Sequence, residues 1–230
     1  MFAAFGPDPE MQLYERGIRR RLAPMLDGDR RRIELAYSLM LTLPGTPVIR
    51  YGDEIGMGDN LKLPERNCAR TPMQWSTEPQ GGFTKAEKPL LPVISGGPYG
   101  FEHVNVAAQR RDPNSLLNWT ERVVRMRKEV PEIGWGDFAV LRTGKVSVLA
   151  LRYDWRNNAV VFVHNLSASP LEVTFAARDE PEPGERLVNL LADDHSEADS
   201  AGKHHVLLEA YGYRWYRLGG LDYLLKRSDI

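Results

Sequence analysis

A run of six residues between a helical pattern and a long irregular segment constrains the fold of this chain more than any other feature. Residues 46–51, Thr-Pro-Val-Ile-Arg-Tyr, are mainly apolar or β-branched, which predicts a short buried strand. The preceding residues predict a helix over 29–43, with Asp29 as its N-cap and Leu-Pro-Gly at its end. A helix followed by a buried strand is the repeating unit of an α/β fold.

The flanking segments extend this pattern. Apolar residues at helical spacing predict another helix over 9–23, which Pro24 ends. Residues 52–113 are rich in Gly and Pro and show no sustained period. Because loops of that length inside a compact domain are commonly functional, this segment is the first place to look for a site. A helix with an apolar stripe is predicted over 114–130.

After Gly136, the sequence pattern becomes typical of short strands. The predicted strands are 146–153, 159–165, 171–175, 187–191, 206–209 and 213–218. Strands of this length and spacing predict a small antiparallel β-sandwich. We therefore expect an α/β part over 1–134, a β-sandwich over 135–218 and a tail over 219–230.

Composition excludes several classes of function. The 230 residues carry a formal net charge of −1, which argues against a nucleic-acid partner. No apolar run reaches the length of a membrane span, so no membrane partner is expected. The single cysteine, Cys68, rules out an internal disulfide, and we expect a cytoplasmic protein. The five histidines lack metal-ligand spacing, and no metal site is predicted.

Several motifs in a fixed order carry a family resemblance. They are Gly-Thr-Pro-Val-Ile-Arg-Tyr-Gly-Asp-Glu-Ile-Gly-Met-Gly at 45–58, Ala-Arg-Thr-Pro-Met-Gln-Trp at 69–75, Asn-Val-Ala-Ala-Gln at 105–109 and Asp-Pro-Asn-Ser-Leu-Leu-Asn-Trp at 112–119. Together they resemble the eighth-strand region of the α-amylase superfamily, glycoside hydrolase family 13. The strings Ile-Arg-Arg-Arg-Leu-Ala-Pro at 18–24 and Asp-Arg-Arg-Arg at 29–32 resemble its trehalose synthase group.

The resemblance implies an architecture. Members fold as a (β/α)₈ TIM barrel followed by a C-terminal β-sandwich. On that map, 29–43 is the seventh barrel helix, 46–51 the eighth strand, 114–130 the eighth helix and 135–218 the sandwich. The chain is thus expected to hold the last helix–strand–helix portion of a barrel and an antiparallel sandwich.

The resemblance also implies a chemistry. Members act on α-glucosidic bonds, as in maltose–trehalose interconversion or α-glucan hydrolysis, through a retaining mechanism that needs two carboxyl groups. The family places its catalytic Asp, Glu and second Asp after the fourth, fifth and seventh strands. We expect this chain to begin beyond all three, so no catalytic residue is assigned and the chain alone is predicted to be inactive. Calcium sites occur in the family, but their ligands cannot be placed here.

Three residues are predicted to bind substrate. Asp53 and Glu54 follow the predicted strand, at the end where barrel sites are built. They either support a sugar pocket or cap the turn. Arg70 resembles the family arginine near the acceptor sugar, and the alternative is a salt bridge that holds its loop. Gln74 and Trp75 are expected to pack this loop. Phe83 either lines the entrance of the pocket or anchors the loop, and an anchor is the expected role.

Two residues depart from the family pattern. Arg50 stands where relatives have an aromatic or aliphatic residue, and a charge on a central strand is costly unless paired. Asp53, Glu54 or a group from an absent strand is its expected partner. Asn67 stands where an Asp is common, which puts the fine substrate specificity in doubt.

Three hypotheses about function remain open. The chain is an inactive fragment of a trehalose-synthase-like enzyme, one subunit that completes a barrel with an N-terminal chain, or a non-catalytic module that binds sugars. The expected ligands are α-linked glucosides such as maltose or trehalose. A lone eighth strand would leave its amides and carbonyls unpaired, so residues 1–60 are expected to rearrange, self-associate or be poorly ordered.

Overall fold

The computed structural model describes residues 1–14 and 17–219, which divide into two compact units. The first unit comprises Met1–Ile33 and Val48–Arg122, and the second comprises Glu34–Pro47 and the chain from Val123 onward. Each unit is therefore built from two separate stretches of sequence. The predicted tail over 219–230 lies outside the described residues, except for Gly219.

The first unit consists of loops and short helices. Its elements are α1 (Phe2–Phe5), β1 (Gln12–Leu13), β2 (Gly17–Ile18), α2 (Leu22–Met25), α4 (Val106–Arg111) and the one-turn 3₁₀ helices Pro9–Met11, Asp53–Ile55, Glu65–Ala69 and Pro79–Gly82. Helix α3 (Arg30–Thr42) begins in this unit and α5 (Leu116–Lys128) starts there as well. A small core of Ile55, Met57, Met73 and Val106 holds the loops together.

The predicted helix over 9–23 is wrong. The backbone of Tyr14 is left-handed, with φ of 52°, and β1 and β2 pair there as a short antiparallel hairpin. The arginines that follow are held by a distant loop instead of by a helix. Arg20 Nε lies 2.8 Å from Asp59 Oδ2, and the Arg19 guanidinium donates to the carbonyl of Leu61 at 3.2 Å. These contacts, far apart in sequence, override the local helical pattern.

The predicted strand over 46–51 is also not formed. Within the described residues, none pairs with this run as a strand, and a 3₁₀ turn follows at Asp53–Ile55. A strand exists only through a neighbour that shares its backbone hydrogen bonds, and the described residues supply none. Gly52 makes the turn with φ of 86°, where a Cβ would lie 2.3 Å from Met57 Sδ.

Helices α3 and α5 confirm the two other predicted helices. Asp29 caps α3 as expected, since its Oδ1 accepts from the amides of Arg31 at 2.9 Å and Arg32 at 3.2 Å. The predicted bounds, 29–43 and 114–130, exceed the observed ones by one or two residues at each end.

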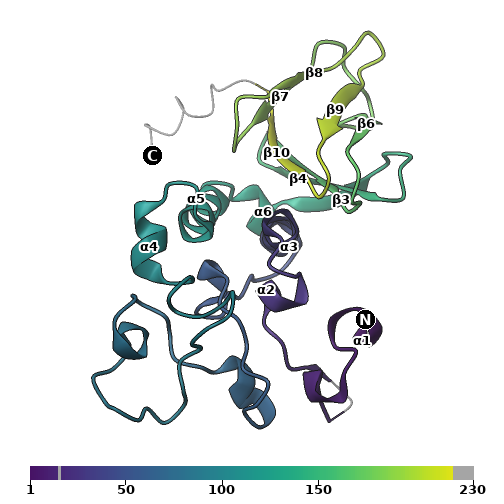
Figure 1. Ribbon diagram of the computed structural model, residues 1–230. Coiled ribbons are helices and arrows are strands. Elements are labelled where there is room, and N and C mark those ends of the chain that lie inside the picture. The colour runs from purple at the N-terminus through teal and green to yellow at the C-terminus, as the bar shows by residue number, and fades with distance from the viewer. Residues whose placement is uncertain (15–16, 220–230) are drawn as a thin grey trace. The chain divides into compact units, whose positions relative to one another are not determined.

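The second unit is an antiparallel β-structure (Figure 1). One sheet of six strands has the order β3-β4-β5-β10-β7-β8, and β6 and β9 pair as a second sheet. The bounds are β3 Asp137–Leu141, β4 Val148–Trp155, β5 Asn158–Asn165, β6 Leu171–Phe175, β7 Arg186–Asn189, β8 Ser196–Glu197, β9 His204–Leu208 and β10 Tyr213–Leu218, with α6 at Glu132–Trp135. All six predicted strands are confirmed, and β3 and β8 were not predicted.

Strand β5 shows why this unit is stable, because seven consecutive residues of it are buried. Val161 and Val163 pack on one side in a core shared with β6 and β9. Phe162 packs edge-on against Trp215, with ring centroids 5.2 Å apart. Trp215 Nε1 in turn donates to Ser38 Oγ of α3 at 2.8 Å. Both sides of the sheet are thus covered at this point.

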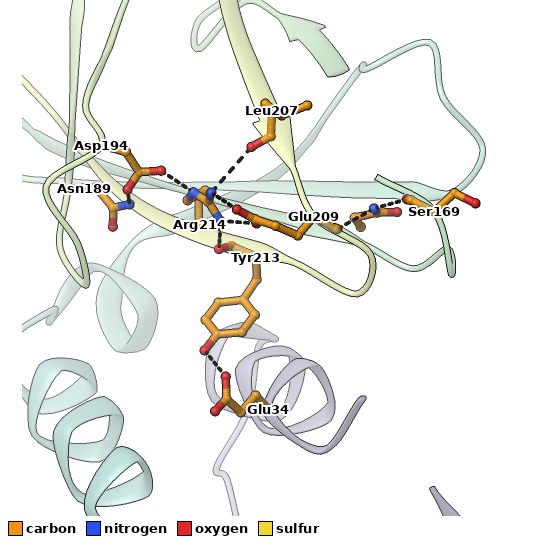
Figure 2. A network of polar contacts seen from close by, with 9 residues as sticks. Glu34, Ser169, Asn189, Asp194, Leu207, Glu209, Tyr213 and Arg214 are labelled. Atoms are coloured by element: carbon orange, nitrogen blue, oxygen red, sulfur yellow. Dashed lines mark hydrogen bonds and ion pairs between the residues drawn. The ribbon is translucent and has the colours of Figure 1, made fainter. Parts of the chain in front are cut away.

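Polar contacts join α3 to β10 and β4, and further polar contacts hold the side chain of Arg214 on β10. The hydroxyl of Tyr213 donates to Glu34 Oε2 at 3.0 Å, as Figure 2 shows. In the same view, the guanidinium of Arg214 contacts both carboxylate oxygens of Glu209 at 3.0 Å and Asp194 Oδ2 at 2.5 Å. The hydroxyl of Tyr153 donates to the Thr42 carbonyl at 2.6 Å.

Candidate functional site

A pocket of about 510 Å³ opens on the first unit. Aromatic and aliphatic side chains form most of its wall, and one carboxylate and one guanidinium interrupt it. The residues that matter here are Tyr51, Glu54, Arg70, Trp75, Phe83 and Leu90. Except for Tyr51, which ends the predicted strand, these residues belong to the segment 52–113, where the sequence predicts a functional loop.

Hydrogen bonds between loops set the shape of this pocket. The hydroxyl of Tyr51 donates to the carbonyl of Thr71 at 2.9 Å, so the two walls are tied together. The backbone amide of Trp75 donates to the carbonyl of Gly81 at 2.8 Å. Gln74 is fully buried and donates to the carbonyl of Tyr99 at 3.1 Å, which confirms that it packs the loop.

Gln80 and Gly81 form the tight turn that brings the chain back to the backbone of Trp75. Gln80 and Gly81 both have a left-handed backbone, with φ of 58° and 63°. A Cβ on Gly81 would lie 3.2 Å from Val93 and 3.4 Å from Phe101. This turn therefore favours glycine, and it carries Phe83 to the pocket.

Arg70 lies at the end of the 3₁₀ helix Glu65–Ala69 and lines the pocket. Its amide donates to the carbonyl of Asn67 at 3.0 Å, and the side chain is exposed. Within residues 1–14 and 17–219, its guanidinium has no hydrogen-bond or ion-pair partner, so the alternative of a salt bridge holding the loop is not supported. A planar guanidinium in this position can donate several hydrogen bonds to a ligand.

Glu54 is the pocket's carboxylate. Burial raises its pKa, and hydrogen bonds from its own amide and that of Gly52 oppose this shift. Its Oε2 is buried and accepts no hydrogen bond from the described residues. The carboxylate thus offers an unused acceptor beside the pocket.

Unlike Glu54 and Arg70, the third predicted residue, Asp53, does not line the pocket. Its Oδ1 lies 2.7 Å from Nη1 of Arg21. Burial raises the pKa of Asp53, while the charge of Arg21 and its hydrogen bond lower it. Among the described residues Arg50 forms no ion pair with Asp53 or Glu54, although its charge lowers the pKa of Asp53. Arg50 is exposed, and its guanidinium lies 5.8 Å from the centre of the Tyr51 ring, so a partner from an absent strand stays a prediction.

Sequence reasoning did not single out Arg21, which is 2% exposed. Its Nη1 donates to the Tyr51 carbonyl at 2.9 Å, and its guanidinium lies 5.3 Å from the Tyr51 ring centre. It therefore supports one pocket wall from beneath. The only signal was its place in a run of three arginines, which looks the same as a solvated surface.

Two aromatic residues have a different role from the expected one. Trp75 is 47% exposed and Phe83 51% exposed, and both face the pocket instead of packing or anchoring the loop. Leu90 extends this apolar surface. Exposed aromatic faces beside a free guanidinium and a carboxylate suit a ligand with apolar faces and hydroxyl groups.

The described residues contain no group of three or more His, Cys, Asp and Glu that could hold a metal ion. Across the same stretches of chain, none of the helices has the length and apolar character needed to cross a bilayer.

Asn67, the other departure from the family pattern, accepts a hydrogen bond from the Arg70 amide through its backbone carbonyl.

The family models define the class: an α-amylase-type catalytic segment followed by a sucrose hydrolase-like C-terminal segment. The family model for the α-amylase catalytic domain matches residues 19–136, and that for the sucrose hydrolase-like C-terminal domain matches 158–217. The chain belongs to the α-amylase superfamily, glycoside hydrolase family 13.

Curated relatives point to one group within the family. Trehalose synthase of Pimelobacter sp. is 39% identical over 228 residues, which cover 96% of this chain and 39% of the relative. Trehalose synthase of Thermus thermophilus is 46% identical over 170 residues, covering 73% and 18% of the two chains. The chain therefore spans about two fifths or less of the length of these relatives.

Solved structures support the fold. Trehalulose synthase MutB of Pseudomonas mesoacidophila MX-45 matches with a TM-score of 0.66 at 22% identity, over 88% of this chain and 42% of that one. Trehalose-6-phosphate hydrolase of Bacillus licheniformis matches with a TM-score of 0.66 at 20% identity, over 87% and 41%.

Proposed function

We propose that this chain is the C-terminal portion of an α-amylase-family enzyme that acts on α-glucosidic bonds, and that its pocket forms one wall of the sugar site. The proposal is carried by the Arg70 guanidinium, which has no hydrogen-bond or ion-pair partner among the described residues and lies in a pocket with exposed Trp75 and Phe83. A sugar ring has apolar faces that stack on aromatic rings and hydroxyls that accept from a guanidinium.

The proposed substrates are α-linked glucosides such as maltose or trehalose, in interconversion or hydrolysis. The names of the Pimelobacter and Thermus relatives favour maltose–trehalose interconversion. The 45–58 and 69–75 motifs support the same group. The domain limits of 1–134 and 135–218 and a cytoplasmic location belong to this proposal.

In this proposal, different parts of the enzyme cleave the bond and bind the sugar. The carboxylates that break the bond come from the preceding barrel strands, which correspond to the part of the relatives that this chain does not match. Glu54 and Arg70 then bind the sugar, and Asp53 positions Arg21 beneath Tyr51. The chain alone binds sugar without cleaving it.

A second candidate function is a non-catalytic sugar-binding or complementing subunit. It is favoured by the single carboxylate that lines the pocket, because retaining hydrolysis needs a pair about 5 Å apart. Addition of the missing barrel portion separates the two: turnover of maltose by the mixture identifies a complementing piece, and binding without turnover identifies a module.

Sugar binding is tested by titrating the full chain with maltose and recording tryptophan fluorescence. We expect saturable quenching, with binding weakened about tenfold or more in Arg70→Ala because hydrogen bonds to a charged group are worth about 1.5–3 kcal/mol. Arg111→Ala is the control, since Arg111 is exposed and outside the pocket. Absence of a fluorescence change and of heat in calorimetry would overturn the proposal.

A further inference from the structure

A second pocket of about 510 Å³ opens on the second unit, where the hairpin of β4 and β5 turns. We call it the hairpin pocket, and all the residues that line it belong to the second unit. Charged and amide side chains form most of its wall. The members that matter here are Asp137, Arg152, Asp154, Arg156, Asn157, Asn158 and Arg178. A pocket of this volume is large enough for a small molecule.

Two carboxylates line the hairpin pocket, and only one of them is neutralised. Asp137 on β3 lies directly opposite Asp154 on β4 in the register of the sheet. The guanidinium of Arg152 holds Asp154 with two hydrogen bonds, of 2.6 Å and 2.5 Å. Among the described residues, the side chain of Asp137 has no hydrogen-bond or ion-pair partner. Since like charges opposite each other on neighbouring strands repel, the pocket favours a cationic group beside Asp137.

The opposite charge is available on Arg156, at the tip of the hairpin. Arg156 and Asn157 have a left-handed backbone, with φ of 51° and 65°, and form the two-residue turn between Trp155 and Asn158. Such a turn favours Gly, Asn and Asp, so the local backbone does not account for an arginine. The guanidinium lies 4.4 Å from the centre of the Trp155 ring. Within residues 1–14 and 17–219 it has no ion-pair partner, so it is available to an anionic group.

Arg178 adds one more donor to the wall. Its Nη1 lies 2.9 Å from Glu182 Oε1 and its Nη2 lies 2.5 Å from Glu185 Oε1, so its charge is balanced. Its Nε, however, is buried and has no hydrogen-bond partner in the part of the chain that the structure describes. A buried donor without a partner is costly and favours an incoming acceptor. The hairpin pocket thus offers an acceptor for a cation on Asp137 and donors for an anion on Arg156 and Arg178.

We infer that the hairpin pocket binds a small zwitterion, a free α-amino acid with a polar, uncharged side chain. The ammonium group pairs with Asp137, and the carboxylate takes the donors of Arg156 and Nε of Arg178. The side-chain amides of Asn157 and Asn158 line the same pocket and suit a polar side chain.

The charges of the hairpin pocket favour this occupant over two simpler ones. A neutral sugar would form hydrogen bonds there and leave the charges of Asp137 and Arg156 uncompensated. A phosphate ion would pair with Arg156 and add negative charge beside two carboxylates. A zwitterion balances both signs, and bonds between charged partners are the stronger ones. The inference does not depend on the proposed function, because no residue of the pocket at Arg70 takes part.

The test titrates the full chain with L-glutamine. Calorimetry measures the dissociation constant, and the indole N–H resonance of Trp155, assigned with Trp155→Phe, reports the place of binding. We expect saturable binding and a shift of this resonance. N-acetyl-L-glutamine, which lacks the ammonium group, and L-glutamine α-amide, which lacks the carboxylate, should each bind at least tenfold more weakly.

Two variants remove one charge each. Asp137→Asn keeps the size of the side chain, and Arg156→Asn places a residue that tolerates the left-handed backbone of the turn. Each should weaken binding of L-glutamine at least tenfold. Asp137→Asn should also discriminate less against the N-acetyl analogue, and Arg156→Asn less against the α-amide. Asp193→Asn, exposed and outside the hairpin pocket, is the control and should bind like the unaltered chain.

Three outcomes would overturn the inference. One is the absence of heat and of a shift of the Trp155 resonance with L-glutamine. Another is equal affinity for L-glutamine and both analogues, because the charges would then not be recognised. The third is a shift of the resonance by maltose or inorganic phosphate but not by L-glutamine, which would identify a sugar or a simple anion as the occupant. The maltose titration keeps the two proposals apart, since Asp137→Asn should still bind maltose and Arg70→Ala should still bind L-glutamine.

Discussion

The two units of this chain use their polar groups in opposite ways. In the second unit, β4 and β5 pair over eight residue pairs, and helix residues join the sheet through Ser38. In the first unit, the amides of residues 48–50 and two donors of the buried Arg21 have no hydrogen-bond partner among the described residues. The second unit therefore satisfies its polar groups within its own sheet and helix. The first unit, which leaves some polar groups without hydrogen bonds, carries the candidate site.

The largest expected effect is in the core of the second unit. Phe162→Ala should lower the free energy of unfolding by about 3–5 kcal/mol, because the side chain is fully buried against Trp215 and leaves a cavity. Urea denaturation measures it. Leu207→Ala, on a residue that is 66% exposed, is the control and should change little. An equally small effect for Phe162→Ala would show that this core is loosely packed.

Acid should destabilise the second unit through His164. Burial lowers the pKa of His164 to about 4 from an ordinary 6.5. Between pH 6.5 and 4 the unfolded chain binds the proton more readily, so stability from this group is complete above pH 6.5 and falls as pH drops to about 4. At about 1.4 kcal/mol per unit, the loss is roughly 3 kcal/mol. Unfolding of His164→Gln should depend less on pH in that window, and an unchanged dependence would contradict the assignment.

Removal of one hydroxyl tests the link between α3 and the sheet. Ser38 Oγ accepts from Trp215 Nε1 at 2.8 Å and lies 2.9 Å from His164 Nε2. Ser38→Ala leaves both groups buried without this partner and should cost about 1–3 kcal/mol. Thermal unfolding measures it, with Ser200→Ala at an exposed position as the control. Equal unfolding temperatures for the two variants would show that the link contributes nothing.

The smallest expected effect is a stabilisation, not a destabilisation, and it concerns Glu54 of the first unit. Burial raises the pKa of Glu54, so its ionisation at neutral pH disfavours the folded state, and this penalty diminishes as the pH falls. Glu54→Gln removes the charge and should stabilise the first unit slightly at pH 7. Hydrogen exchange of residues 52–57 measures it, and Glu78→Gln is the exposed control. Destabilisation would show that Glu54 has a partner in solution.

The sequence was most informative where local pattern and packing agree. Strands such as 159–165 were predicted because their apolar run matches a surface buried on both sides. Asp29 was recognised as a cap because its side chain bonds within its own helix. Strand β3 was missed because the predicted series of short strands began only at residue 146, and β8 has just two residues.

The failures have one physical cause, which is contact at long range. The helix over 9–23 loses to the contacts of Arg20 with Asp59, and the strand over 46–51 needs a neighbour that the described residues do not supply. Glu54 and Arg70, two of the three predicted residues, line the candidate pocket, and their binding of substrate stays a prediction. The support by Arg21 and the exposure of Trp75 follow from tertiary structure. No local periodicity encodes these contacts.

The location of bound sugar tests the central claim most directly. Hydrogen exchange of the full chain should be recorded with and without maltose at the concentration that half-saturates the unaltered chain, alongside Arg70→Ala as the matched variant. The account predicts slower exchange in the loops over 70–91, which line the pocket, with no change in β3–β10, and much less slowing in Arg70→Ala. Protection confined to the β-strands, or equal protection in Arg70→Ala, would contradict it.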